Sequence, residues 1–238
     1  LTWTPVRDGR QVWDIGIPNR SGSEFAGGDD YFHDGMGLIY ALRFPDDVHF
    51  TIGKSDFRKD WFYLQVPHAS AAAIAAATVD AKPRPVRGRG GFGFGARGAG
   101  TQPGMAGRGA FGRRGGRGAR GGRGGARRGG RGGAAAAPNR ATPWTIDFDL
   151  PTAPHGKATL RLGIATSNTR ELSVTVNGQQ AGTLDGLPTD SSIGRKGIRG
   201  IWFERDVPFD ASLLRQGHNT LTLTVPAGGL TSGIIYDD

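Results

Sequence analysis

The stretch from Lys82 to Gly133 divides the chain and limits what it can fold into. It holds 22 glycines, 13 arginines and one lysine in 52 residues, and no acidic residue. Glycine loses the most backbone entropy when it is ordered, and this stretch has almost no apolar side chain to bury in return. The composition therefore predicts a polycationic, low-complexity segment without a core, so any globular fold must come from the residues around it.

The basic character of the chain is confined to this stretch. The stretch carries a charge of +14 in a chain whose formal net charge is +9, so the other residues sum to −5. This distribution is typical of a polyanion-binding or self-associating arm on an ordinary domain. The absence of cysteine excludes disulfides, thiol catalysis and thiolate metal sites. No apolar run approaches the ~20 residues that span a bilayer, so we expect no membrane insertion.

Short apolar segments separated by turn signals predict β-strands on both sides of the stretch. In the first half the pattern favours strands at residues 12–17, 48–53 and 61–66, and a polar turn at 54–59. Residues 37–44 fit either a strand or one or two helical turns. In the second half the predicted strands are 144–150, 158–165, 171–176, 179–184, 200–209, 220–225 and 234–236.

Two local signals in the second half are more specific. Asn177-Gly178 predicts a tight hairpin turn between two of these strands. Asp210 is a suitable cap for a single helical turn that Gly217 would end. Without any long amphipathic helix, the chain is predicted to be all-β, a β-sandwich of about eight strands with one short helical turn.

Each half alone has too few strands for a core, so we expect residues 1–68 and 142–238 to form a single domain. Residues 69–141 are then an alanine-flanked, Arg-Gly-rich insertion in one surface loop. Such an insertion is tolerable because the entropy of loop closure grows only slowly with length.

The sequence outside the insertion resembles the C-terminal domain of rhamnogalacturonan lyases, polysaccharide lyase family 4. The resemblance rests on these pieces, in order: Trp13-Asp-Ile-Gly16-Ile-Pro-Asn-Arg20, Glu24-Phe25, Phe44-Pro45, Ile52-Gly53-Lys-Ser-Asp56, Asp60-Trp61, Leu160-Arg-Leu, Val174-Thr-Val-Asn177-Gly178, Gly197-Ile-Arg-Gly200, Leu214-x-x-Gly217-x-Asn219-Thr220-Leu221 and Ile235-Tyr236-Asp237. The chain departs from the family at Asn19, where Asp is usual, and in the Arg-Gly insertion. The last strand is expected to be cut short at Asp238.

The resemblance implies a jelly-roll fold related to carbohydrate-binding modules, secreted or on the cell surface, in a bacterium. In that family the lyase site lies in a different, N-terminal domain, and no position here matches it. We therefore expect a non-catalytic module that binds acidic plant polysaccharide such as pectin. The sequence shows no Ser-His-Asp pattern, and its histidines do not have the spacing of metal ligands, so neither feature supports an enzyme.

The residues predicted to bind carbohydrate form two sets. The first is Lys54, Asp56, Arg58, Asp60 and Trp61, where an aromatic face adjoins charged groups that suit a uronate. The alternative, which the usual polarity of turns favours, is that Trp61 is core and the turn is self-paired.

The second set is Trp13, Asp14 and Arg20, of which Trp13 and Arg20 are the predicted contacts. The alternative is that Trp13, like Trp202, lies in the core or at its rim, and that Asp14 pairs with Arg20 as plain structure.

Asp29, Asp30 and Asp34 could supply oxygen ligands to a structural Ca²⁺, although a solvated acidic loop is the favoured interpretation. We expect no other cofactor.

The arginines of the insertion are predicted to bind a polyanion, which can be acidic polysaccharide or nucleic acid through residues 82–133. The third interpretation is a linker without specific contacts. The arginines concerned are Arg113, Arg114, Arg117, Arg120, Arg123, Arg127, Arg128 and Arg131.

A structural role is the other alternative. A short last strand after Tyr236 would leave a sheet edge that another chain could complete, building an oligomer or fibre with the Arg-rich arm.

Overall fold

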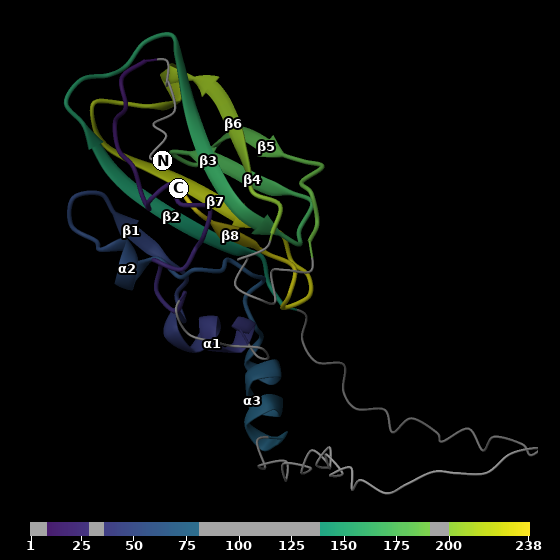
Figure 1. Cartoon of the computed structure of the whole chain (residues 1–238). Coiled ribbons are helices and arrows are strands. Elements are labelled where there is room, and N and C mark those ends of the chain that lie inside the picture. The colour runs from purple at the N-terminus through teal and green to yellow at the C-terminus, as the bar shows by residue number, and fades with distance from the viewer. Residues whose placement is uncertain (1–8, 29–35, 81–138, 191–199) are drawn as a thin grey trace, which may run out of the picture. The chain divides into compact units, whose positions relative to one another are not determined.

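The computed structural model describes residues 9–28, 36–80, 139–190 and 200–238. The described residues on either side of the insertion belong to one compact unit. They form eight strands in two sheets (Figure 1), and the predicted all-β, jelly-roll sandwich of about eight strands is confirmed. The strands are β1 (His49–Thr51), β2 (Thr142–Leu150), β3 (Lys157–Ser167), β4 (Leu172–Val176), β5 (Gln179–Leu184), β6 (Phe203–Asp210), β7 (Gly217–Val225) and β8 (Ile234–Tyr236).

The larger sheet has the order β1-β2-β7-β4-β5 and the smaller one β6-β3-β8. The antiparallel pair β2–β7 is the centre of the larger sheet, since it pairs at nine positions, from Thr142 with Val225 to Leu150 with Gly217. Along β2 the buried positions alternate with partly exposed ones until Leu150. This period of two places every second apolar side chain in the core.

In the described part of the chain, four helical segments accompany the strands. They are α1 (Met36–Arg43), α2 (Phe57–Asp60), α3 (Ala71–Asp80) and the 3₁₀ turn η2 (Ala211–Leu213). The ambiguous segment 37–44 is thus helical. The predicted turn at Asp210 is confirmed, because its side chain accepts a hydrogen bond of 2.9 Å from the Ser212 backbone N–H. Gly217 follows with a φ of +80° and begins β7.

Two predicted strands of the first half are wrong. Residues 12–17 form no strand, because only Ile15 is buried there while Val12 and Ile17 face solvent. Residues 61–66 are all buried, so this segment lies within the core instead of at a half-exposed sheet surface. Its backbone makes only isolated bridges, Phe62 with Ala26 and Gln65 with Ile234.

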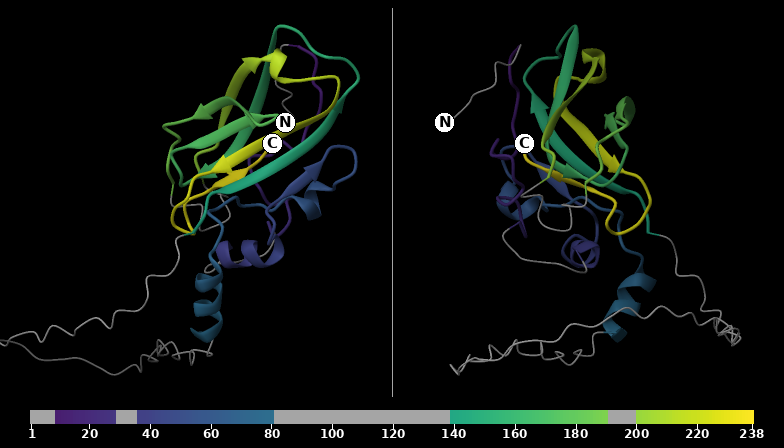
Figure 2. Two further views of the ribbon diagram at one scale, coloured as in Figure 1. Left: turned by 180° about the vertical axis from the view of Figure 1, so that it is seen from behind. Right: turned by 45° about the vertical axis from the view of Figure 1, so that its right-hand side comes forward.

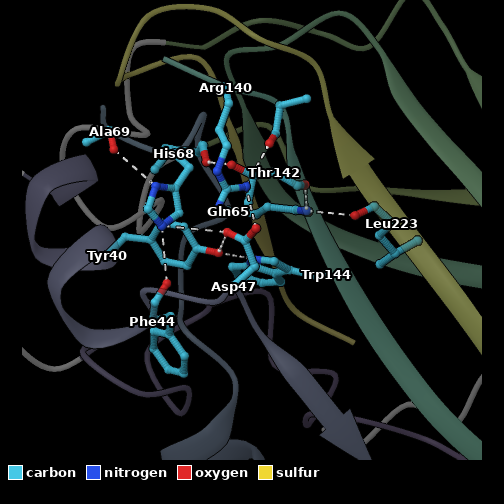
Figure 3. A network of polar contacts seen from close by, with 12 residues as sticks. Tyr40, Phe44, Asp47, Gln65, His68, Ala69, Arg140, Thr142, Trp144 and Leu223 are labelled. Atoms are coloured by element: carbon cyan, nitrogen blue, oxygen red, sulfur yellow. Dashed lines mark hydrogen bonds and ion pairs between the residues drawn. The ribbon is translucent and has the colours of Figure 1, made fainter. Parts of the chain in front are cut away.

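The two halves of the sequence interlock. β1 lies beside β2 in every view (Figures 1 and 2) and pairs with it in parallel, Phe50 opposite Ile146. His68 and Arg140, on either side of the insertion, exchange two backbone hydrogen bonds of 2.9 and 3.1 Å. Figure 3 shows the polar network at this junction, where Asp47 binds both Tyr40 and Arg140.

The expected open edge beside the last strand is absent. β8 pairs with β3 on one side, and on the other Gln65 exchanges two backbone hydrogen bonds of 2.9 Å with Ile234. All three residues of β8 are buried. The physical basis for adding another chain at this edge is therefore lost.

Candidate functional site

The first predicted set lies around α2, and its two carboxylates are occupied by the helix itself. The Asp56 side chain accepts a hydrogen bond of 3.0 Å from the Arg58 backbone N–H, and Asp60 accepts one of 2.8 Å from the Asp56 N–H. The bond from Arg58, together with Lys59 at 3.4 Å, holds the pKa of Asp56 below its ordinary value. Lys54 and Arg58 are the exposed cations of the set.

Trp61 does not belong to a ligand surface. Its side chain is 3% exposed and lies edge-on against Trp144, Tyr236 and Phe50, at 4.9, 5.7 and 5.9 Å between ring centroids. A sugar ring needs an open aromatic face to stack on. The interpretation of Trp61 as core is therefore the right one, and its predicted ligand role is wrong.

The second set is divided between the core rim and the surface. Trp13 is half-buried, with its ring 5.5 Å from Phe148. Asp14 accepts a hydrogen bond of 2.8 Å from Gln11. Arg20 is exposed, and its guanidinium lies 5.0 Å from the centroid of the Trp202 ring.

One buried carboxylate bonds Trp202 and the backbone on both sides of Arg20. Asp237 is fully buried, and its Oδ2 accepts a hydrogen bond of 2.7 Å from Trp202 Nε1. Its Oδ1 accepts bonds from the backbone N–H groups of Asn19 (3.1 Å) and Ser21 (3.0 Å), the two neighbours of Arg20. Arg20 itself has a φ of +67°. The carboxylate thus positions the indole ring and the backbone that carries Arg20.

Glu24 completes what we call the Trp202 cluster: Asn19, Arg20, Ser21, Glu24, Trp202 and Asp237. Its carboxylate accepts hydrogen bonds from the Ile17 N–H (3.3 Å) and from Asn19 Nδ2 (3.2 Å). Partial burial raises the pKa of Glu24 despite these bonds, and the negative charge of Asp237 adds to the effect.

The cluster has the chemical parts of a site for an acidic sugar. A guanidinium offers a planar fork of donors to a carboxylate, and an indole offers an apolar face to a pyranose ring. The flanking residues Ile17 and Ile201 are exposed large hydrophobics, at 42% and 57%.

Sequence reasoning identified Arg20 but not its partners. The sequence places Trp202 in the core or at its rim, and Asp237 enters only through the family resemblance. The contact between Trp202 and Asp237 joins residues 35 apart, and the contact of Asp237 with Asn19 joins residues 218 apart. No local pattern signals pairs that the tertiary fold brings together.

A second polar group lies on the outer face of the larger sheet. Asp147 on β2 contacts the exposed imidazoles of His49 and His218 and accepts a hydrogen bond of 2.8 Å from Thr220. Burial raises the pKa of Asp147, but the bonds from His49 and Thr220 outweigh it and hold the pKa below its ordinary value. Within the described ranges, no three His, Asp or Glu side chains form a metal site.

The remaining predicted residues cannot be placed. Asp29, Asp30 and Asp34, and the arginines of the insertion from Arg113 to Arg131, lie outside the described residues. None of the helices in the described part is long and apolar enough to cross a membrane.

Comparison with known families gives a match over residues 11–238, to the family described as CBM-like, polysaccharide lyase family 4, domain III. No curated protein matches the chain.

Among solved structures, a family 35 carbohydrate-binding module from an environmental isolate is 22% identical, with 41% of this chain and 63% of that chain covered and a TM-score of 0.29. CBM35 from Cellvibrio japonicus Abf62 is 25% identical, with 41% and 60% covered and a TM-score of 0.27. The chain thus spans less than two thirds of both. Because these TM-scores are low, we draw no conclusion from the solved structures, and the family assignment rests on the match over residues 11–238.

Proposed function

This chain belongs to the CBM-like domain III family of polysaccharide lyase family 4, and we propose that it binds acidic polysaccharide at the Trp202 cluster. The observation that supports this proposal is the exposed Arg20 guanidinium stacked 5.0 Å from the Trp202 ring. Family membership favours a glycan as ligand, and the guanidinium favours one with carboxylates.

The rigid support of the cluster favours a binding role. A backbone segment and a ring that are positioned before binding lose less entropy when the ligand arrives. Asp237 is fully buried and uses both its oxygens on Trp202 and on the backbone around Arg20. A uronate carboxylate could then take the guanidinium donors while the sugar ring contacts exposed parts of Trp202.

We propose a non-catalytic role, in which the domain holds its polymer for chemistry carried out elsewhere. We also propose that the protein is secreted or lies at a bacterial cell surface, where such polymers are found. Lys54 and Arg58 near α2 stay predicted contacts for the same ligand class. Nucleic-acid binding through residues 82–133 concerns residues outside the described part and stays an alternative prediction.

Affinity for galacturonate oligosaccharides, measured by titration calorimetry, tests the site. Arg20→Gln and Trp202→Ala should each weaken binding at least tenfold, since each removes one of the two recognising groups. Arg205→Gln is the matched control, because Arg205 lies 4.7 Å from the Phe203 ring outside the cluster. Equal affinities for wild type and both cluster variants would refute the site, and no binding by folded wild type would refute the function.

A further inference from the structure

The two halves of the sequence meet through backbone pairing of the kind that joins separate chains. We call the described residues before the insertion the first half and those after it the second half. β1 of the first half adds to the edge of β2, and Gln65 pairs with Ile234 beside β8. Addition of an extended segment to a sheet edge is a common way for a domain to recognise a peptide.

Gln65 is the most specific contact between the halves. It is fully buried, and Figure 3 shows its amide reaching into the second half. Nε2 donates to the carbonyl oxygens of Thr142 (2.8 Å) and Leu223 (2.9 Å), and Oε1 accepts from the Tyr236 hydroxyl (2.5 Å). Every one of these partners belongs to the second half. If the first half were separated from the second half, the Gln65 amide would need other hydrogen-bond partners.

A second polar contact crosses at the insertion. Asp47, whose side chain is 7% exposed, accepts hydrogen bonds from Tyr40 (2.7 Å) and from Arg140 of the second half (2.5 Å). The Tyr40 hydroxyl in turn accepts a bond of 2.7 Å from Trp144 Nε1. Burial, together with Asp47, raises the pKa of Tyr40, so the hydroxyl remains a donor.

The apolar contacts, like the polar ones, run between the two halves. The first half has a single three-residue strand among its described residues, so it has no sheet core of its own. Two of its buried aromatic residues contact rings of the second half: Trp61 packs on Trp144 and Tyr236, and Tyr40 packs on Trp144. Large apolar contacts with a few buried, fully bonded polar groups are the properties of a specific interface between partners.

We propose that the second half recognises the first half as a partner in its own right, without the peptide link. A chain cut between residues 81 and 138 would stay assembled, and two cut copies would exchange their first halves. The link would then contribute only an effective local concentration of the first half, which falls as a linker lengthens.

The test uses the full chain with a recognition sequence for a site-specific protease inserted after Gly104. After cutting under native conditions, both pieces should elute together in size-exclusion chromatography. The Tm should depend on protein concentration only after the cut, because unfolding then separates two molecules. Mixing cut protein with a ¹⁵N-labelled cut copy, after unfolding and refolding, should give hybrid masses in native mass spectrometry. Pieces that separate on cutting, or that never form hybrids, would overturn the proposal.

Two glutamines, the buried Gln65 and the exposed Gln180, provide a pair of variants that differ in the half to which they bond. Gln180 makes its hydrogen bonds to Ser173, Gly182 and Thr183, all within the second half. In the cut protein, Gln65→Ala should weaken association at least tenfold, and Gln180→Ala by less than twofold. Tyr236→Phe removes only the hydroxyl that binds Gln65 and should also weaken association, which keeps the test valid if Gln65→Ala does not fold. Equal effects of the Gln65 and Gln180 variants would contradict specific recognition.

Discussion

At the scale of single residues, the carboxylate of Asp237 joins three members of the Trp202 cluster. It accepts hydrogen bonds from Trp202 and from the backbone of Asn19 and Ser21 while it is fully buried. A buried donor that loses its acceptor retains the cost of its lost hydration. The side chain therefore stabilises the fold as well as positioning the proposed ligand site.

Asp237→Ala should lower the free energy of unfolding by about 3 kcal/mol, since it leaves three donors without their acceptor. Urea denaturation measures this change. The control is Asp206→Ala, which removes a partly exposed partner of Arg161 and should cost less than about 1 kcal/mol. Similar losses in the two variants would show that Asp237 is not the anchor of the cluster.

Asp147 predicts a pH dependence of stability. Its pKa in the folded protein is held below the unfolded value of about 3.9, so the unfolded chain binds the proton more readily. The contribution of Asp147 is therefore present above about pH 4 and is lost as the pH falls below it.

Asp147→Asn should reduce the loss of unfolding free energy between pH 5 and pH 2, measured by urea denaturation at each pH. The asparagine cannot titrate, so whatever stability it retains does not change in this window. If the unfolding free energy of the variant falls with pH as steeply as that of the wild type, the role assigned to Asp147 is contradicted.

At the scale of elements, the hairpin between β4 and β5 shows how a local sequence determines a local structure. Asn177 and Gly178 have φ angles of +50° and +78°, as the Asn-Gly pair predicts. The Asn177 side chain also donates to Leu213 (2.8 Å) and Asn219 (2.9 Å) and accepts from the Thr220 N–H (3.0 Å). The turn is thus bound to η2 and β7 as well.

Asn177→Gly should cost about 2 kcal/mol of stability, because it keeps the turn geometry but removes these hydrogen bonds. Gly178→Ala should cost only about 1 kcal/mol, because no atom lies within 4 Å of a new Cβ and the positive φ is its one penalty. Thermal unfolding ranks the two variants, and the reverse order would show that backbone strain outweighs the side-chain bonds.

The strands of the second half could be predicted from sequence because their neighbours are other regular strands. Buried positions along β2 and β4 alternate with partly exposed ones, which is the pattern a half-buried sheet produces. Residues 61–66 could not be predicted, since strand propensity does not reveal a segment that is buried on all sides. The same limit applies to the candidate site, where Arg20 was identified and its partners Trp202 and Asp237 were not.

At the scale of the whole molecule, the hydrogen bonds between His68 and Arg140 close the loop that contains the insertion. Paired residues in antiparallel strands lie about 5.5 Å apart, so a short turn could join them. The sandwich therefore does not depend on the inserted residues for its geometry, although the entropy of closing a long loop lowers its stability.

Replacing residues 71–138 by a four-residue Gly-Ser linker should raise the free energy of unfolding by about 2 kcal/mol, from the smaller entropy of loop closure. Urea denaturation measures the change, and binding of galacturonate oligosaccharides shows whether the Trp202 cluster survives. A shortened chain that fails to fold would mean that the inserted residues contribute to the core.

The pairing of Gln65 with β8 also has a consequence for synthesis on the ribosome. The Tyr236 hydroxyl that binds Gln65 comes from a residue made 171 positions later. At a synthesis rate of about 5–20 residues per second, β8 is made about 10–30 seconds after the apolar segment from Trp61 to Val66. During that time its side chains lack the partners that bury them. We therefore expect this segment to be the part of the nascent chain that most needs a chaperone.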